Sequence, residues 1–197
     1  MTAHRSSLRP WTTVGLLALL MLVAQAAGPE LLRYDARAMR SGELWRLWSG
    51  HLVHANMRHL LLNLAGLLLC QALTGVRWRL WQWGWRILWL ATAISLGFWL
   101  LQPQIHWYVG FSGVLFGLYL LAAVAVLRQQ PLVSSLLIVL LLAKILVEQF
   151  SSVKIASSEW IGVPVLVDAH LYGFLAALLL LTLQHGLQRL RTDIAHE

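Results

Sequence analysis

The chain has 197 residues, of which 59% are hydrophobic and 12% are charged, and its mean hydropathy is +0.68. This charged fraction is about half of that in soluble globular domains, so the composition excludes an ordinary soluble domain and predicts an integral membrane protein. The net charge is +7, but the arginines are scattered between apolar segments, which argues against a nucleic-acid-binding surface. A single cysteine, Cys70, excludes an internal disulfide.

Long uncharged segments predict six membrane-spanning helices, because about 20 apolar residues cross a bilayer. Residues 10–29 provide one span, and residues 87–127 are long enough for two, with a break near Pro103 and Gly110. We expect helices near residues 11–27, 51–73, 84–101, 112–127, 132–149 and 168–187. The predicted fold is therefore an all-α membrane protein, a six-transmembrane-helix bundle that forms one domain over residues 1–197.

Lysine and arginine are distributed unevenly about these spans. The side that holds both termini carries eight of them: Arg5, Arg9, Arg77, Arg79, Arg86, Arg128, Arg189 and Arg191. The other side carries five: Arg33, Arg37, Arg40, Arg46 and Lys154. Basic residues are enriched in cytoplasmic loops, so we expect both termini to be cytoplasmic. The expected location is a bacterial-type inner (plasma) membrane.

Two further features concern the membrane interfaces and the N-terminus. A cluster of four tryptophans is expected to form an interfacial belt: Trp78, Trp81, Trp83 and Trp85. The loop at residues 28–50 is expected to pack at the outer interface. The first apolar segment, followed by Ala24-Gln25-Ala26, also resembles a signal peptide with a cleavage site, so whether it is retained stays open.

Polar side chains inside apolar segments indicate function by default, because they are costly to place in a membrane. His59 and Asn63 are four residues apart, which on a helix places them about 40° apart on one face. His54 would face elsewhere on the same helix and is better suited to bracing a loop, and His51 is expected to be solvated. The alternative for His59 and Asn63 is a structural hydrogen bond between helices.

The second polar group is Gly110-Phe111-Ser112-Gly113, placed where a loop becomes a helix. A serine between small residues at such a point can present a hydroxyl nucleophile, and the free N–H groups of the first helical turn can stabilise an oxyanion. The alternative is a packing role, because Gly113 and Gly117 are four residues apart and allow close helix approach.

The third group is Asp168-Ala169-His170 at the start of the last span, followed by Gly173. His170 is expected at the same depth as Ser112, where it can act as the base that a serine nucleophile needs. Gly173 is expected to let the last span lie against the span that begins at Ser112. Asp168 is interpreted as a helix N-cap.

Two polar features have simpler interpretations. Lys144 and Glu148 are an i, i+4 pair, expected to neutralise each other while the lysine reaches toward the interface. His106 lies in the loop before the serine and is expected to be solvated. A nucleophile, a base and oxyanion donors together make up the inventory for acyl transfer without a metal.

These residues resemble the rhomboid intramembrane serine proteases over about residues 44–180. Four motifs occur in the expected order: Trp45-Arg46; His54, His59 and Asn63; Gly110-Phe111-Ser112-Gly113; and Ala169-His170-Leu171-Tyr172-Gly173. The chain departs from the family pattern at two positions, with Ala177 in place of a glycine and Phe116 in place of a frequent tyrosine. Phe116 can still stack on the base.

The resemblance implies a catalytic dyad of Ser112 and His170 with no acid. It also implies oxyanion donors from His59, Asn63 and the Ser112 backbone, with supporting roles for His54, Gly110, Gly113, Phe116 and Gly173. No cofactor, metal or nucleic acid is expected, and the partners are the lipid bilayer and a transmembrane protein substrate.

Within the family, the chain resembles the rhombosortase branch through its short length, the run Tyr108–Leu115 and the form Asp168–Gly173, with Lys144 and Glu148 as weaker support. That branch implies protein sorting, by cleavage of a C-terminal Gly-Gly tail with transfer to an acceptor as a further step. Two alternatives remain: a non-catalytic rhomboid-like protein that binds transmembrane segments, and a histidine-ligated metal or haem protein using His51, His54, His59, His106 and His170.

Overall fold

Each uncharged apolar segment of the sequence has a long helix as its counterpart in the computed structural model, which describes residues 3–150 and 156–194. The long helices are α1 (Ala3–Ala27), α5 (Met57–Thr74), α6 (Leu80–Leu101), α7 (Ser112–Val126), α8 (Pro131–Phe150) and α10 (Asp168–Ile194). Among the described residues, five of these helices are long and apolar enough to cross a membrane, and α7 is shorter. The prediction of an all-α membrane bundle is confirmed.

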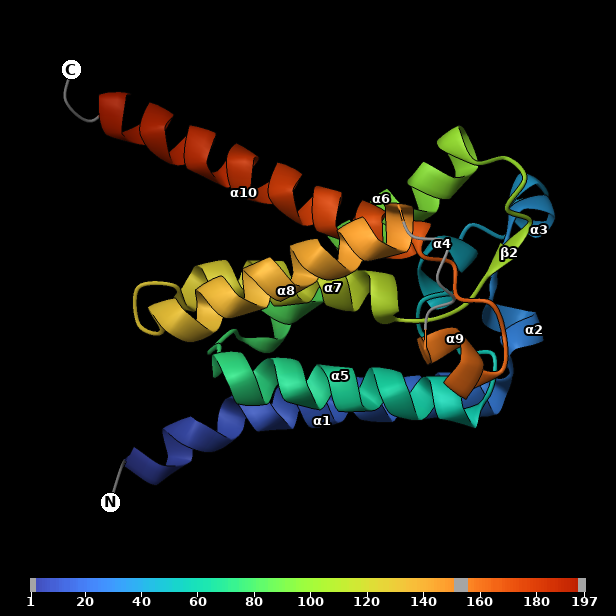
Figure 1. The fold of residues 1–197 in the computed structure, drawn as a ribbon, viewed down its shortest axis with the longest axis horizontal. Helices are drawn as coiled ribbons and strands as arrows, with labels where there is room; N and C mark the ends of the chain where they lie inside the picture. The colour runs from blue at the N-terminus through green and yellow to red at the C-terminus, as the bar shows by residue number, and fades with distance from the viewer. Residues whose placement is uncertain (1–2, 151–155, 195–197) are drawn as a thin grey trace.

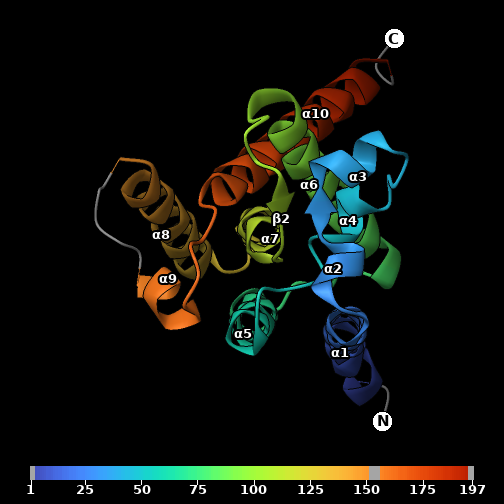
Figure 2. The same cartoon turned by 90° about the vertical axis from the view of Figure 1, so that its right-hand side faces the viewer.

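Helix α7 lies at the centre of the bundle, as the end-on view in Figure 2 shows. Its side chains are apolar around the whole circumference and most of them are buried, as expected for a helix surrounded by other helices. Helices α5, α6, α8 and α10 pack around α7, and α1 packs on α5. The first two residues of α7, Ser112 and Gly113, therefore lie among the surrounding helices.

Helices α7 and α10 approach each other closely, and glycines make the approach possible. A Cβ atom at Gly113 would lie 2.7 Å from the carbonyl oxygen of Ala169, and one at Gly117 would lie 2.7 Å from that of Gly173. A Cβ at Gly173 would overlap the carbonyl oxygen of Gly113. The expected contact between the last span and the span that begins at Ser112 is confirmed.

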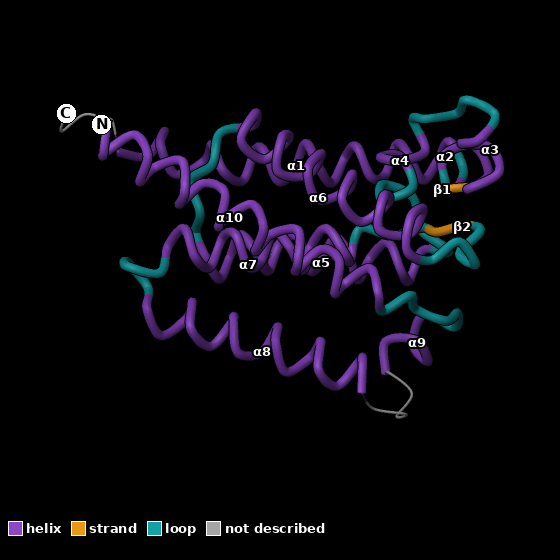
Figure 3. The backbone as a smooth tube through the Cα atoms, turned by 90° about the horizontal axis from the view of Figure 1, so that it is seen from above, coloured by secondary structure: helices purple, strands orange, loops and turns teal. Residues whose placement is uncertain are grey.

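Short elements gather at one end of the bundle, opposite the N-terminal end of α1 and the C-terminal end of α10 (Figure 1). They are α2 (Pro29–Leu32), β1 (Tyr34–Asp35), α3 (Ala36–Arg40), α4 (Arg46–Ser49), β2 (Trp107–Tyr108) and α9 (Ala156–Ile161). β1 and β2 pair antiparallel with Tyr34 opposite Tyr108, and Figure 3 shows these two strands at that end. The pairing fixes the loop between α1 and α5 to the residues just before α7.

The buried guanidinium of Arg46 holds the loop between α1 and α5 in shape. Its Nη1 donates to the carbonyl oxygens of Glu30, at 3.1 Å, and Arg33, at 2.9 Å. Its Nε donates to the carboxylate of Glu43 at 2.7 Å. The loop therefore forms an ordered layer over this end of the bundle.

Two helix starts differ from the sequence prediction. The second span was expected from residue 51, but α5 begins at Met57 because the Asn56 side chain accepts a hydrogen bond from the His59 N–H at 3.0 Å and caps the helix. The third span was expected from residue 84 and begins at Leu80, where the Gln82 side chain accepts from the Arg79 N–H at 2.8 Å.

The expected belt of four tryptophans is wrong for two of its members. Trp83 is fully buried and Trp78 packs edge-on against it, with ring centroids 5.1 Å apart, so both belong to the core. The Arg86 guanidinium lies over the rings of Trp78 and Trp85. Only Trp81 of the four is well exposed. Lys154, which contributed to the orientation prediction, lies outside the described residues.

Candidate active site

Ser112 begins helix α7 after a tight turn built on Gly110. Gly110 has φ +124°, a conformation that favours glycine, and a Cβ there would lie 2.7 Å from the His59 ring. The buried Tyr108 hydroxyl donates to the Gly110 carbonyl oxygen at 2.7 Å and also interacts with the Ser112 hydroxyl and the Gly113 N–H. Burial raises the pKa of Tyr108, so this phenol stays neutral and holds the turn that presents the serine.

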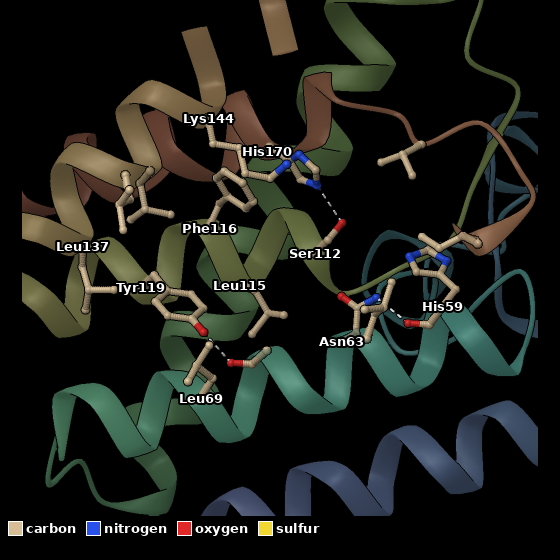
Figure 4. Close-up of a pocket in the computed structure, with 16 residues that line it drawn as sticks. His59, Asn63, Leu69, Ser112, Leu115, Phe116, Tyr119, Leu137, Lys144 and His170 are labelled. Carbon is tan, nitrogen blue, oxygen red and sulfur yellow. Dashed lines mark hydrogen bonds between the residues drawn. The ribbon is translucent and has the colours of Figure 1, made fainter. Parts of the chain in front are cut away.

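His170 reaches Ser112 from the first turn of α10. Its Nε2 lies 3.0 Å from the Ser112 Oγ, and Figure 4 shows the two side chains pointing toward each other. The Phe116 ring stacks on the imidazole, with centroids 4.2 Å apart and planes 4° apart. The expected stacking of Phe116 is confirmed, and the two side chains that sequence analysis paired as nucleophile and base are brought together.

Glu148 of α8 is the neighbour of His170 that sequence analysis missed. Its Oε2 lies 2.7 Å from the His170 Nδ1, and its Oε1 lies 2.7 Å from the Lys144 Nζ. The carboxylate is 1% exposed, whereas the Lys144 side chain is 45% exposed. The expected Lys144–Glu148 pair is present, but the carboxylate is shared with His170.

His59 and Asn63 line the wall of the site formed by α5. Both face the same cavity as Ser112 and His170 (Figure 4), as their spacing on one helix face predicted. The Asn63 Nδ2 donates one hydrogen bond to the His59 carbonyl oxygen at 2.9 Å. A side-chain amide carries two N–H groups, so Asn63 has a second hydrogen for a ligand in the cavity.

His54 lies in the loop before α5, so the expected placement on the opposite face of a helix is wrong. Its ring meets the His59 ring edge-on at 5.0 Å, and burial lowers its pKa to about 3. Gln25 of α1 holds its backbone: the Gln25 Nε2 donates to the His54 carbonyl oxygen at 3.2 Å, and the His54 N–H donates to the Gln25 Oε1 at 2.8 Å. The first helix thus supports the loop beside the site.

Three other sequence interpretations have clear outcomes. His51 was expected to be solvated, but it is fully buried with its Nε2 3.0 Å from the Ser95 Oγ. His106 is exposed, as expected. Asp168 was expected to precede the last helix as its N-cap, but it is the first residue of α10.

Two cavities meet at Ser112. The first has a volume of about 420 Å³, lies between α5, α7 and α8, and is walled mainly by leucines and aromatic rings. The second, about 280 Å³, is lined by residues 163–166 and by the loop at 104–109. His59 borders both cavities. A chain segment that passed from one cavity to the other would lie against the serine hydroxyl.

Comparison with protein-family models matches residues 41–186, well over half of the chain, to the Rhomboid domain. The matched range contains Ser112, His170, His59, Asn63 and Glu148. No curated protein sequence matches the chain at a significant level.

Proposed function

This chain belongs to the rhomboid family, and we propose that it is an intramembrane serine protease in which Ser112 is the nucleophile and His170 the base. The observation that carries the proposal is the 3.0 Å distance between the His170 Nε2 and the Ser112 Oγ at the junction of two cavities. Members of this family generally act as intramembrane serine proteases on transmembrane substrates.

The first step is attack on a substrate peptide bond. The Ser112 hydroxyl transfers its proton to the His170 Nε2 while its Oγ bonds to the carbonyl carbon. The tetrahedral intermediate then collapses, the peptide C–N bond breaks, and the leaving amine takes the proton from His170. The acyl group remains bound to the Ser112 Oγ.

The negative charge on the substrate carbonyl oxygen needs hydrogen-bond donors. We assign this role to the backbone N–H of Ser112, the free amide N–H of Asn63 and the imidazole of His59, because α5 presents both side chains to the cavity that contains Ser112. Gly110 lets the His59 ring approach the turn closely, and the edge-on contact of His54 supports that ring from behind.

Water or an amine acceptor then attacks the acyl-enzyme and releases the acyl group from the Ser112 Oγ. For the substrate we propose a transmembrane tail with small residues near the cleaved bond, because Ser112 lines both cavities and an unwound segment that passed between them would bring its backbone to the serine. The resemblance to the rhombosortase branch refines this to a C-terminal Gly-Gly sorting tail on an exported protein. The arginine distribution supports cytoplasmic termini, with Ser112 toward the opposite side. The resemblance to the rhombosortase branch is the basis for proposing a bacterial-type inner membrane.

The test is cleavage of a membrane-tethered reporter that carries a Gly-Gly tail, with purified wild-type protein, Ser112→Ala and His170→Ala. We expect cleavage by the wild type alone, and the product mass distinguishes hydrolysis from transfer. A tail with the two glycines replaced by leucine is the matched substrate control. Ser112→Ala protein that still processed the tail would refute the assignment of the nucleophile.

A second readout separates catalysis from binding alone. A fluorophosphonate probe labels an activated serine covalently, without needing the natural substrate. We expect labelling of wild-type protein at Ser112 and none after His170→Ala. Wild-type protein that binds transmembrane peptides but never labels would instead be a non-catalytic member of the family.

A further inference from the structure

We propose that Glu148, kept ionised by Lys144, is a positioning residue that fixes the hydrogen of His170 on Nδ1 and leaves Nε2 free to take the proton of Ser112. This inference rests on the proposed protease function. It adds a carboxylate from α8 to the pair of residues that the family resemblance implies. The observations that carry it are the contacts on the two oxygens of Glu148.

The contact with His170 decides the position of the imidazole hydrogen. An ionised carboxylate can only accept hydrogen bonds, so at 2.7 Å from the Glu148 Oε2 the His170 Nδ1 has to carry the hydrogen. In a neutral imidazole the other nitrogen is then an acceptor. The His170 Nε2 therefore faces the Ser112 hydroxyl in the one form that can remove its proton.

Lys144 favours the ionised form of Glu148, which this positioning role requires. A protonated Glu148 could donate to Nδ1, which would place the imidazole hydrogen on Nε2 and leave no acceptor for Ser112. Lys144 lies 2.7 Å from the second carboxylate oxygen, and this neighbouring positive charge favours the ionised acid in apolar surroundings. Lys144 is half exposed while Glu148 is buried, so the cation extends outward and the anion points at the histidine.

The geometry also restricts rotation of the imidazole. Phe116 of α7 stacks on one face of the ring, Glu148 of α8 holds Nδ1, and Ser112 of α7 meets Nε2. Contacts from two helices besides its own thus orient His170. A carboxylate that served only to neutralise Lys144 would not need its second oxygen at 2.7 Å from the histidine.

The experiment compares kcat and KM for reporter cleavage among five proteins: wild type, Glu148→Gln, Lys144→Met, Lys144→Arg and the double variant Lys144→Met/Glu148→Gln. We expect kcat to fall about 100-fold or more for Glu148→Gln, by analogy with amide replacement of the acid in serine protease triads, with little change in KM. Lys144→Met should also lose kcat, whereas Lys144→Arg should retain it. Ser134→Ala, a buried substitution at the other end of α8, is the matched control and should behave as wild type.

The double variant discriminates a positioning role from simple charge neutralisation. It removes both charges together, so a pair that only neutralised itself would leave kcat at the wild-type level. We expect the double variant to be as impaired as Glu148→Gln. Fluorophosphonate labelling of Ser112 should slow in parallel, because the label reports the serine and its base without tail binding.

A spectroscopic measurement on the unsubstituted protein keeps the test decisive if Glu148→Gln folds poorly. In histidine-labelled protein we expect a strongly downfield N–H proton on the His170 Nδ1, still present in Ser112→Ala and lost in His170→Ala. Absence of that proton in wild type, or a wild-type kcat for Glu148→Gln, would overturn the role of Glu148. If the role of Glu148 were overturned in this way but Ser112→Ala were still inactive, the proposed protease function would stand without a role for Glu148.

Discussion

Acidification should weaken the fold through His51, a buried histidine outside the membrane spans. Its side chain is fully buried with its Nε2 against Ser95, and burial lowers its pKa from 6.5 to about 4. At pH 7 this ring is neutral in the folded state and mostly neutral in the unfolded state. As the pH falls below 6.5, the unfolded state binds a proton that the folded state does not, so the free energy of unfolding decreases until the pH approaches 4.

The size of the effect of His51 follows from the difference between the two pKa values. One pKa unit corresponds to about 1.4 kcal/mol, so the free energy of unfolding should fall by about 2 kcal/mol between pH 7 and pH 5 and by about 3 kcal/mol at pH 4. His54, with its pKa lowered to about 3 by burial, adds a loss in the same direction over the same range.

The assay is equilibrium unfolding in mixed micelles of mild and denaturing detergent, followed by tryptophan fluorescence at pH 7 and pH 5. His51→Gln removes the titrating ring, so its stability difference between the two pH values should be about 2 kcal/mol smaller than that of wild type. His106→Gln removes an exposed histidine and should leave the wild-type difference unchanged. Equal differences in wild type and His51→Gln would refute the reasoning.

Three further predictions concern the supports of the site. Gly173→Ala forces a methyl group against the Gly113 carbonyl and should cost about 1–3 kcal/mol together with most of the cleavage activity; full activity would mean that α7 and α10 separate freely. Gln25→Ala removes two hydrogen bonds to the His54 backbone and should lower stability by about 1–2 kcal/mol in the same unfolding assay; an unchanged unfolding curve would count against this support from α1. Phe116→Ala should reduce kcat by roughly 2- to 10-fold through loss of the stacked ring, and Phe116→Tyr should retain it.

The helical bundle could be predicted from the sequence because membrane spans depend on local composition. The start of α7 at Ser112 and the approach of His170 were also predictable, since a glycine turn before an apolar run and small residues at helix spacing are local signals. Gly113 and Gly173 lie in contact because neither has a side chain, so the backbone of the facing helix can approach each of them.

The failures came from contacts between distant segments. Six more helical residues, 51–56, were expected before Met57, but Asn56 caps the helix there, so the angular argument for His54 did not apply. His51 was expected in solvent, but α6 supplies Ser95 as its partner. These outcomes depend on how the first loop folds over the bundle, which no local pattern in the sequence specifies.

Glu148 was missed for a similar reason. The spacing from Lys144 indicated an ion pair, and an ion pair accounts for both charges without a third group. Which way the carboxylate turns depends on the rotation of α8 relative to α10, two helices that are largely separated by α7 and meet at His170. Periodicity within α8 carries no information about that rotation.

Helix α8 has two roles at the site, and together they bear on which membrane proteins could be cleaved. α8 forms one wall of the cavity beside Ser112 and also carries the carboxylate that contacts His170. An intact helix is about 10–12 Å wide with its side chains, so admitting one beside Ser112 would push α8 outward and draw Glu148 away from the base. Under the proposed function, His170 would keep its contact with Glu148 beside an extended strand and lose it beside an intact helix, so stable helices of neighbouring membrane proteins would be left uncut.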